Sequence, residues 1–439
     1  MKKFLFYWEE LKSTFWFIPS VLIFFSIILA FAFLFLDSRY QIAPSGLLPY
    51  VFGTDVNSTR SVLSTISGAM ISVAGTTFSI TLVALTLTSS QFGSRLIKNF
   101  MYVRLNQVVL GAYVATYLYC LLVINAIKDA NGNAFIPTIS ILFALILAIV
   151  NILLLIVFIH HIATSIQANK VILDVTEALT KNTKSLFPEK IGERVGQKKD
   201  RSYDPVQEKS TYSFEYDLFS TEMGYLQYLD SDALLKQIAN LGGLVALKIR
   251  PGDFVVSGML IGTLHTKEDI EEGTENQILN HLIFGSTRLH QQDIEFSLNQ
   301  LVEIAVRALS PGINDPFTAN MCIDNLTATV SNLAQVKFPS PYRADEEEQL
   351  RLIVPAVNFE GIVEVAFSSI RQYAGGNTPV IYRLMKAFTT IDQFVLLDAH
   401  RHVLQRHAQM VWQVGEQHID QENDLQILKK IAKPLIGDG

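Results

Sequence analysis

The stretch from Ile66 to Leu96, ISGAMISVAGTTFSITLVALTLTSSQFGSRL, decides the class of fold. It carries no charge until Arg95, and it is longer than the roughly 20 residues that a helix needs to cross a bilayer. Unlike an ordinary lipid-facing span, it is rich in serine and threonine. The sequence therefore predicts a membrane-spanning helix with a partly polar surface.

Three further stretches have the length and composition of membrane spans. They are Phe15–Leu36, Leu105–Ile127 and Ala130–Ile159, while the second span lies within Ser61–Ser94. The first run is too long for a signal peptide and no small-residue cleavage site follows it. Only 17% of the residues are charged, against about 25% in soluble domains. We therefore expect a four-span transmembrane domain over residues 1–165.

The charges of the short loops predict the orientation. The loop between the second and third spans contains Arg95, Lys98 and Arg104 and no acidic residue. Because cytoplasmic loops carry an excess of Lys and Arg, this loop and both termini are expected to be cytosolic. The prediction is a multi-pass membrane protein, with the lipid bilayer as a partner and these three cations at the cytosolic mouth of the spans.

The hydroxyl groups of the second span fall on one face of a helix. At 3.6 residues per turn, small and hydroxyl side chains form a stripe that contains Thr65, Gly68, Ser72, Thr76, Ser79 and Thr86. Such a stripe permits close packing of neighbouring helices, which is the commoner arrangement. It also suits the wall of a water-filled path around an oligomer axis. Both interpretations stay open, and both predict a homo-oligomer.

The region after the fourth span changes character. We expect a helical extension and linker over residues 166–210, a small β-rich module over 211–268 and a mainly helical domain over 269–439. The segment GGLVALKIRPGDFVVSGMLIGTL, Gly242–Leu264, predicts three strands separated by turns. It is similar in shape to lipoyl- and biotinyl-type barrels, but no lysine stands at a hairpin tip, so no cofactor is expected. The fold class is an α-helical integral membrane protein followed by an α+β cytosolic domain.

The segment SPGINDP, Ser310–Pro316, interrupts two helical patterns. One interpretation is a tight helix–turn–helix connection, in which Asp315 is the N-cap and Pro316 the first helical residue. The other is a ligand loop, because a helix N-terminus attracts anions. Its candidate residues are Arg288, Arg307, Ser310, Asn314 and Asp315. Three histidines in a helix predicted over Thr390–Glu416 are interpreted as surface residues: His400, His402 and His407.

Several function classes are disfavoured by what the sequence lacks. No Asp, Glu, Lys or Arg lies inside a predicted span, whereas ion-coupled pumps normally keep an ionisable residue there. No nucleotide-binding loop, nucleophile elbow or zinc-helix motif is present, so we expect no catalytic residues, metal or cofactor and no enzyme activity. The net charge of −6 does not favour a nucleic-acid partner.

Three stretches carry a resemblance to a known family. They are GTTFSITLVALTLTSSQFGSRLIKNF at Gly75–Phe100, RPGDFVVSG at Arg250–Gly258 and DIEFSLNQLVEIAVRALSPGINDPFTA at Asp293–Ala319. The sequence resembles a widespread bacterial family of predicted integral membrane proteins classed as a domain of unknown function. The resemblance implies four amino-terminal spans, a cytosolic domain and a location in the bacterial inner membrane, but no activity. The leading hypothesis is a passive channel-like pore, and the alternative is a non-conducting receptor or scaffold.

Overall fold

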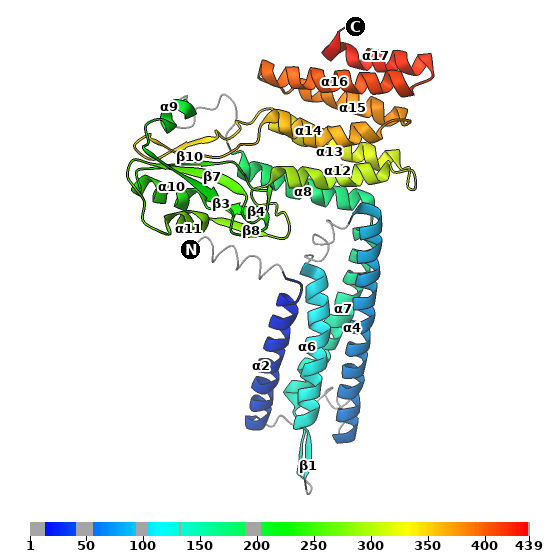
Figure 1. The fold of residues 1–439 in the computed structure, drawn as a ribbon. Coiled ribbons are helices and arrows are strands. Elements are labelled where there is room, and N and C mark those ends of the chain that lie inside the picture. Colours follow the sequence, from blue (N-terminus) through cyan, green and yellow to red (C-terminus); the bar gives the residue numbers. More distant parts are fainter. Residues whose placement is uncertain (1–13, 41–55, 94–103, 131–132, 189–202, 438–439) are drawn as a thin grey trace. The chain divides into compact units, whose positions relative to one another are not determined.

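The computed structural model describes residues 14–40, 56–93, 104–130, 133–188 and 203–437 (Figure 1). The chain divides into two compact units, Met1–Lys170 and Val171–Gly439. The first is a helical bundle and the second is a mixed α/β region followed by helices. This is the predicted fold class.

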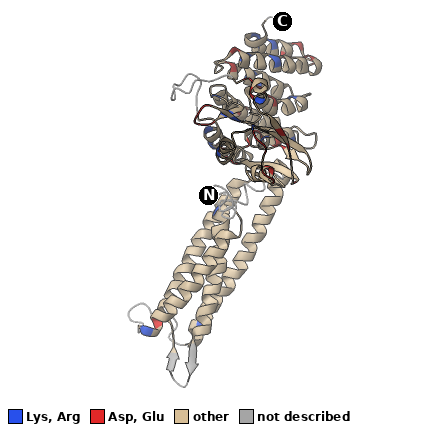
Figure 2. Ribbon diagram, turned by 60° about the vertical axis from the view of Figure 1, so that its left-hand side comes forward, with Lys and Arg blue, Asp and Glu red and all other residues tan. Residues whose placement is uncertain are grey.

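Four long apolar helices form the first unit, and each is long enough to cross a membrane. They are α2 (Phe17–Arg39), α4 (Val56–Phe92), α6 (Arg104–Ala126) and α7 (Thr138–Ser165). Helix α6 packs against each of the other three. Figure 2 shows that the charged residues of the described bundle lie near the helix ends, and the residues between them are apolar or weakly polar. The prediction of four spans is confirmed.

Two span boundaries differ from the prediction. The fourth span begins at Thr138 rather than Ala130, because a short hairpin of β1 (Lys128–Ala130) and β2 (Asn133–Phe135) precedes it. Helix α4, which contains the second span, begins at Val56 rather than within Ser61–Ser94, and it contains 37 residues. At 1.5 Å per residue it is about 55 Å long, so it exceeds a hydrocarbon core of roughly 30 Å.

Buried polar contacts join the helices of the bundle. The carboxylate of Asp37, at the end of α2, accepts hydrogen bonds from the backbone N–H of Ile139 at 2.8 Å and of Ser140 at 2.9 Å. It also accepts the Ser140 hydroxyl at 2.6 Å. Asp37 therefore caps the N-terminus of α7 from another helix. In the same way the Arg60 guanidinium donates to the carbonyl oxygen of Ile127, just beyond the end of α6, at 2.7 Å.

The second unit begins with α8 (Ala168–Leu186), as predicted, and continues into two small sheets. The five-stranded sheet has the order β3-β7-β5-β10-β9, and the three-stranded sheet has the order β6-β4-β8. Their strands are β3 (Phe214–Phe219), β4 (Gly224–Leu229), β5 (Leu244–Leu247), β6 (Phe254–Val255), β7 (Leu260–Thr266), β8 (Leu282–Gly285), β9 (Tyr342–Ala344) and β10 (Leu350–Ile353). The pairing of β10 with β5 is parallel and the others are antiparallel. Short helices α9 (Pro205–Lys209), α10 (Ser231–Asn240) and α11 (Thr274–Leu279) accompany the strands.

The strands predicted within Gly242–Leu264 form, but they do not pair in succession. Strand β5 pairs with β7, whereas β6 pairs with β4 in the other sheet. The region expected to be mainly helical also contributes β8, β9 and β10. These strands are recruited because Leu352 and Val354 join the same buried cluster as Val245 and Leu264.

The rest of the second unit is a stack of six helices (Figure 1). They are α12 (Ile294–Ala308), α13 (Pro316–Leu333), α14 (Phe359–Tyr373), α15 (Thr378–Asp392), α16 (Asp398–His418) and α17 (Glu422–Ile436). Helix α13 packs on α12 and α15, and α15 packs on α16 and α17. The single helix predicted over Thr390–Glu416 is therefore wrong, since α15 ends at Asp392 and α16 begins at Asp398.

The interpretation of all three α16 histidines as surface residues is also wrong. His407 is fully buried, with its Nε2 3.4 Å from Oε2 of Glu364 on α14. His400 is partly buried and stacks on the ring of Phe359, with ring centroids 4.2 Å apart. Burial lowers the pKa of both imidazoles, and for His407 it outweighs the opposing charge of Glu364. Only His402 of the three is exposed.

These buried histidines predict a pH-dependent stability. Because the pKa of folded His407 lies below its ordinary 6.5, the unfolded chain binds more protons as the pH falls below that value. Stability present above about pH 6.5 is therefore lost as the pH falls towards the folded pKa. We expect the melting temperature of detergent-solubilised protein to fall between pH 7 and 5, by less in His407→Leu than in the wild type.

His402→Leu, an exposed position on the same helix, is the control and keeps the wild-type slope. His265 and His400, whose pKa values are also lowered by burial, contribute a residual slope in every variant. An unchanged slope in His407→Leu would contradict this account.

Candidate functional site

The predicted stripe lies on the side of α4 that faces away from the other helices of the bundle. The residues of α4 that are buried inside the bundle include Thr59, Leu63, Ser67, Met70, Ala74, Thr77, Thr81, Ala84 and Thr88. At 100° per residue their common direction is roughly opposite to that of the stripe. The stripe residues Thr65, Gly68, Ser72, Thr76, Ser79 and Thr86 are all exposed in the single chain. They are thus brought together on one face, as predicted.

Four of the five exposed hydroxyls of the stripe are bonded to their own helix. The Oγ1 of Thr65 donates to the carbonyl of Ser61 at 2.8 Å, and the Oγ of Ser79 donates to the carbonyl of Gly75 at 2.9 Å. Thr76 and Thr86 make the same contact one turn back, at 3.1 and 2.9 Å. Each proton is satisfied while the oxygen still faces outward. The face is therefore weakly polar and needs no partner in another helix.

Packing inside the chain does not explain the small residues of the stripe. A Cβ added at Gly68 or Gly75 would meet no atom within 4 Å. At Gly111 on α6, by contrast, an added Cβ would lie 2.8 Å from Cδ1 of Leu22 and 2.9 Å from Cα of Pro19. Gly111 is thus required by the contact of α2 with α6. Gly68 and Gly75 leave open space on the outer face of α4.

The outward faces of the other spans differ from that of α4. Helices α2 and α7 expose large apolar side chains of the kind that suit lipid: Phe24, Phe31, Phe35, Ile149, Ile152 and Ile156. On α4 such side chains flank the stripe, with Phe78 and Leu82 on one side and Ile80 and Leu87 on the other. The stripe is therefore a narrow band of small and hydroxyl groups between two apolar borders, interrupted by Val83.

Sequence reasoning missed a second line of hydroxyls on the opposite side of α4. Ser67, Thr77, Thr81 and Thr88 are buried within the bundle. They stand 10, 4 and 7 residues apart, which keeps them on one helix face, but the same face holds the buried apolar residues. A further polar contact lies between α7 and α6, where Asn151 donates to Oγ1 of Thr116 at 2.7 Å. These groups stabilise the bundle rather than the outer face.

The predicted cationic mouth is described in part. Arg104 is exposed in the first turn of α6. Arg95 and Lys98 lie outside the described residues. Among the described residues, no cluster of three His, Cys, Asp or Glu side chains is placed to hold a metal ion.

The SPGINDP segment has the geometry of a helix–turn–helix connection. Asp315 caps α13 by accepting from the N–H groups of Phe317 and Thr318, both at 3.1 Å. Its own N–H donates to the carbonyl of Ala308, and Asn314 adopts a left-handed φ of 47°. The Ser310 hydroxyl donates to the carbonyl of Arg307 at 2.7 Å. The polar groups of the turn are therefore engaged in making it.

The five candidate residues of the ligand loop are not all brought together. Arg307, Ser310, Asn314 and Asp315 lie at the C-terminal end of α12 and the start of α13. Arg288 lies at the other end of α12, where its guanidinium makes two contacts with the Asp293 carboxylate, at 2.6 and 2.8 Å. A helix of 15 residues, about 22 Å long, separates the two places.

Two of the three stretches that carry the family resemblance meet beside Arg288, at the start of α12. Asp293 is the N-cap of α12, and the turn at Gly252 closes against its carboxylate. Arg250, beside that turn, pairs with Glu295 in the first turn of α12 at 2.7 Å. Burial alone would lower the pKa of Arg288, but the hydrogen bond and charge of Asp293 raise it overall. The RPGDFVVSG and DIEFSLNQ segments therefore form one structural element.

Comparison with known proteins identifies the family of the chain. Residues 12–390 match a family described as "Predicted membrane protein (DUF2254)". Two uncharacterised proteins, one from Mycobacterium bovis and one from Mycobacterium tuberculosis, are each 30% identical over 370 residues. Each alignment covers 83% of this chain and 70% of the relative. No solved structure matches the chain.

Alanine substitution at two glycines of RPGDFVVSG distinguishes the cost of backbone strain from the cost of a close contact. Gly252 (φ +101°) and Gly258 (φ +81°) both have left-handed backbones, so alanine at either costs about 1–2 kcal/mol. A Cβ at Gly252 would also lie 2.5 Å from Oδ2 of Asp293, whereas one at Gly258 would meet nothing within 4 Å. We expect Gly252→Ala to lower the free energy of unfolding more than Gly258→Ala, measured by denaturant titration of the solubilised protein. Equal losses would show that the contact with Asp293 is unimportant.

Proposed function

We propose that this chain, which belongs to the DUF2254 family of predicted membrane proteins, forms a homo-oligomeric, channel-like passive pore. In this proposal the protein is not an enzyme, and the pore is built from its four spans. The second span, α4, lies nearest the axis in this proposal. The observation that carries it is the exposed Ser/Thr/Gly stripe of α4, which faces away from the rest of its own bundle.

In the proposed oligomer, another protein surface covers the borders of the stripe. Small residues let helix backbones approach closely, and association in membranes gains chiefly from such packing. Gly68 and Gly75 make no use of their small size within the chain. Identical subunits offer identical stripes, and closed symmetry places each one at the same distance from the axis. The apolar borders of the stripe supply packing contacts, while its centre remains free to face the axis.

The chemistry of the stripe suits a passive path for ions. Hydroxyl oxygens offer weak dipoles without fixed charge, so that an ion can leave as readily as it enters. In the described parts of the four spans, Asp, Glu, Lys and Arg occur only near the helix ends, such as Asp37 and Arg60. A coupled transporter normally keeps an ionisable group at midplane. The arrangement therefore favours passive conduction.

The second unit has a role at the cytosolic end of the proposed pore. The loop charges favour a cytosolic location for both termini, and in this proposal the unit Val171–Gly439 serves as a vestibule or gate. Arg104, with Arg95 and Lys98 in the same loop, biases the cytosolic mouth towards anions.

A non-conducting receptor or scaffold is the competing function. The hydroxyl-to-carbonyl bonds along the stripe, such as that of Ser79, satisfy the hydroxyl protons even when the face is dry. A stripe buried entirely between subunits would therefore be stable and would leave no path. The two functions agree on an oligomer and differ in whether water reaches α4.

The oligomer is tested by enlarging the small residues. Gly68→Leu should leave the fold of the single chain intact, because nothing lies within 4 Å of the new Cβ, and should reduce the mass of the solubilised particle to that of a smaller assembly. Gly111→Leu should instead destabilise the chain itself, because its Cβ meets Pro19. Light scattering with a melting curve distinguishes these effects. A wild-type protein that is a monodisperse monomer would refute the oligomer.

The path is tested by cysteine accessibility at three consecutive residues of α4. Phe78, Ser79 and Ile80 are all exposed in the single chain, but only Ser79 lies on the stripe. In a background with Cys120 and Cys322 replaced by alanine, Ser79→Cys should react with a water-soluble thiol reagent, and Phe78→Cys and Ile80→Cys should not. Modification should reduce ion flux into liposomes severalfold at Ser79 alone. No reaction at Ser79, with no flux above empty liposomes, would leave the scaffold.

A further inference from the structure

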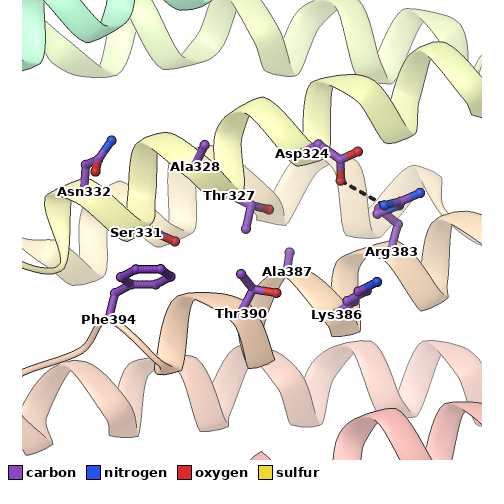
Figure 3. A pocket seen from close by; sticks show the side chains of 10 residues that line it. All are labelled: Asp324, Thr327, Ala328, Ser331, Asn332, Arg383, Lys386, Ala387, Thr390 and Phe394. Carbon is purple, nitrogen blue, oxygen red and sulfur yellow. Dashed lines mark hydrogen bonds and ion pairs between the residues drawn. The ribbon is translucent and has the colours of Figure 1, made fainter.

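We propose that a pocket between α13 and α15 binds a nucleoside monophosphate or an anion of that class, with a phosphate at one end and a planar ring system at the other. The pocket has a volume of about 450 Å³, within the range of small-molecule sites. The two helices lie side by side, and Figure 3 shows the side chains of Thr327, Ser331 and Phe394 directed into the space between them. This inference does not rest on the proposed pore.

One end of the pocket carries an excess positive charge. Arg383 pairs with Asp324 across the two helices at 3.2 Å, which leaves these two groups neutral together. Lys386 lies one turn along α15 on the same wall (Figure 3). It is exposed and makes no ion pair with any described carboxylate. The ammonium of Lys386, supported by the fixed guanidinium of Arg383, is therefore available to a phosphate.

The wall formed by α13 contains a hydroxyl without a partner. Ser331 is 6% exposed, and its Oγ makes no hydrogen bond in the protein. Its neighbour Thr327, which also lines the pocket, instead donates to the carbonyl of Ile323 at 2.6 Å. Buried hydroxyls are normally paired, so the Oγ of Ser331 needs an explanation. Figure 3 shows it directed towards the space between α13 and Phe394, where a polar ligand atom would satisfy it.

The other end of the pocket presents an aromatic face. Phe394 follows the end of α15, and its side chain is 42% exposed. Small residues, Ala328 and Ala387, keep the space between the two ends open (Figure 3). An exposed aromatic face accepts the planar ring of a base by stacking. Asn332, beside it, offers amide groups to the edge of such a ring.

The distance between the two ends determines the size of the ligand. Lys386 stands six positions before the end of α15 at Asp392, which corresponds to about 9 Å along the helix, and Phe394 follows two residues later. Inorganic phosphate can occupy only the end near Lys386, and a neutral nucleoside gains nothing from the cation. A nucleoside monophosphate combines the two parts with a ribose, whose hydroxyls fit beside Thr327 and Thr390.

The experiment is isothermal titration of the full chain in nanodiscs with AMP, GMP, CMP and UMP. Adenosine and inorganic phosphate serve as ligands that lack one part each. Lys386→Gln should weaken AMP about tenfold or more and leave adenosine unchanged, because it removes one charge-assisted contact. Phe394→Ala should weaken AMP and adenosine alike. Ser331→Ala should weaken AMP severalfold, and Lys430→Gln, an exposed lysine of α17 outside the pocket, should have no effect.

Three results would overturn the proposal. The first is the absence of binding for all four nucleotides at millimolar concentration. The second is an equal loss in Lys386→Gln and Lys430→Gln, which would show a general charge effect. The third is binding of inorganic phosphate as tightly as AMP, which would remove any role for the aromatic face. None of these results bears on the oligomer or on conduction, so failure here is distinguishable from failure of the pore.

Discussion

The absence of water in a hydrocarbon layer is the constraint on which the rest of this structure depends, because each polar group there must find its partner within the protein. The bundle meets this constraint in three ways. Asp37 caps α7 from the end of α2, and Arg60 bonds the carbonyl of Ile127 beyond α6. Asn151 pairs with Thr116 between α7 and α6. Exposed hydroxyls of α4, such as that of Thr65, donate to carbonyls of their own helix.

Because of these hydroxyl-to-carbonyl hydrogen bonds, the polar side chains of α4 do not need to pack against another helix. A helix whose hydroxyl protons are satisfied internally can present serine and threonine on either side. The side that contains Ser67 and Thr81 is buried in the bundle, and the side that contains Ser72 and Ser79 is not. A chain under selection only for bundle stability would place apolar side chains on the outer side, as α2 and α7 do. The outer stripe therefore indicates a role beyond the single chain.

Much of this fold was predictable because its signals are local. Runs of apolar residues revealed the four spans, and Asp315 with Pro316 revealed the start of α13. The rest depends on residues far apart in the chain. Strand β10 pairs with β5 about a hundred residues away, and that pairing has no local signature. The burial of His407 was hidden for the same reason, since its neighbour Glu364 lies on another helix. On α4 the stripe was predictable from periodicity, but the side it faces required the packing of α6.

A ligand in the pocket between α13 and α15 can control a membrane path only if it binds two conformations of the protein with different affinities. A ligand shifts an equilibrium between two conformations by no more than the difference of its affinities for them. The pocket lies between α13 and α15 and its ligand groups come from both helices, with Lys386 on one and Ser331 on the other. Its affinity therefore depends on the spacing of that helix pair, which is also packed on α12 and on α16. A rearrangement of the stack that changes this spacing would change affinity, and by reciprocity the ligand would favour one arrangement of the stack.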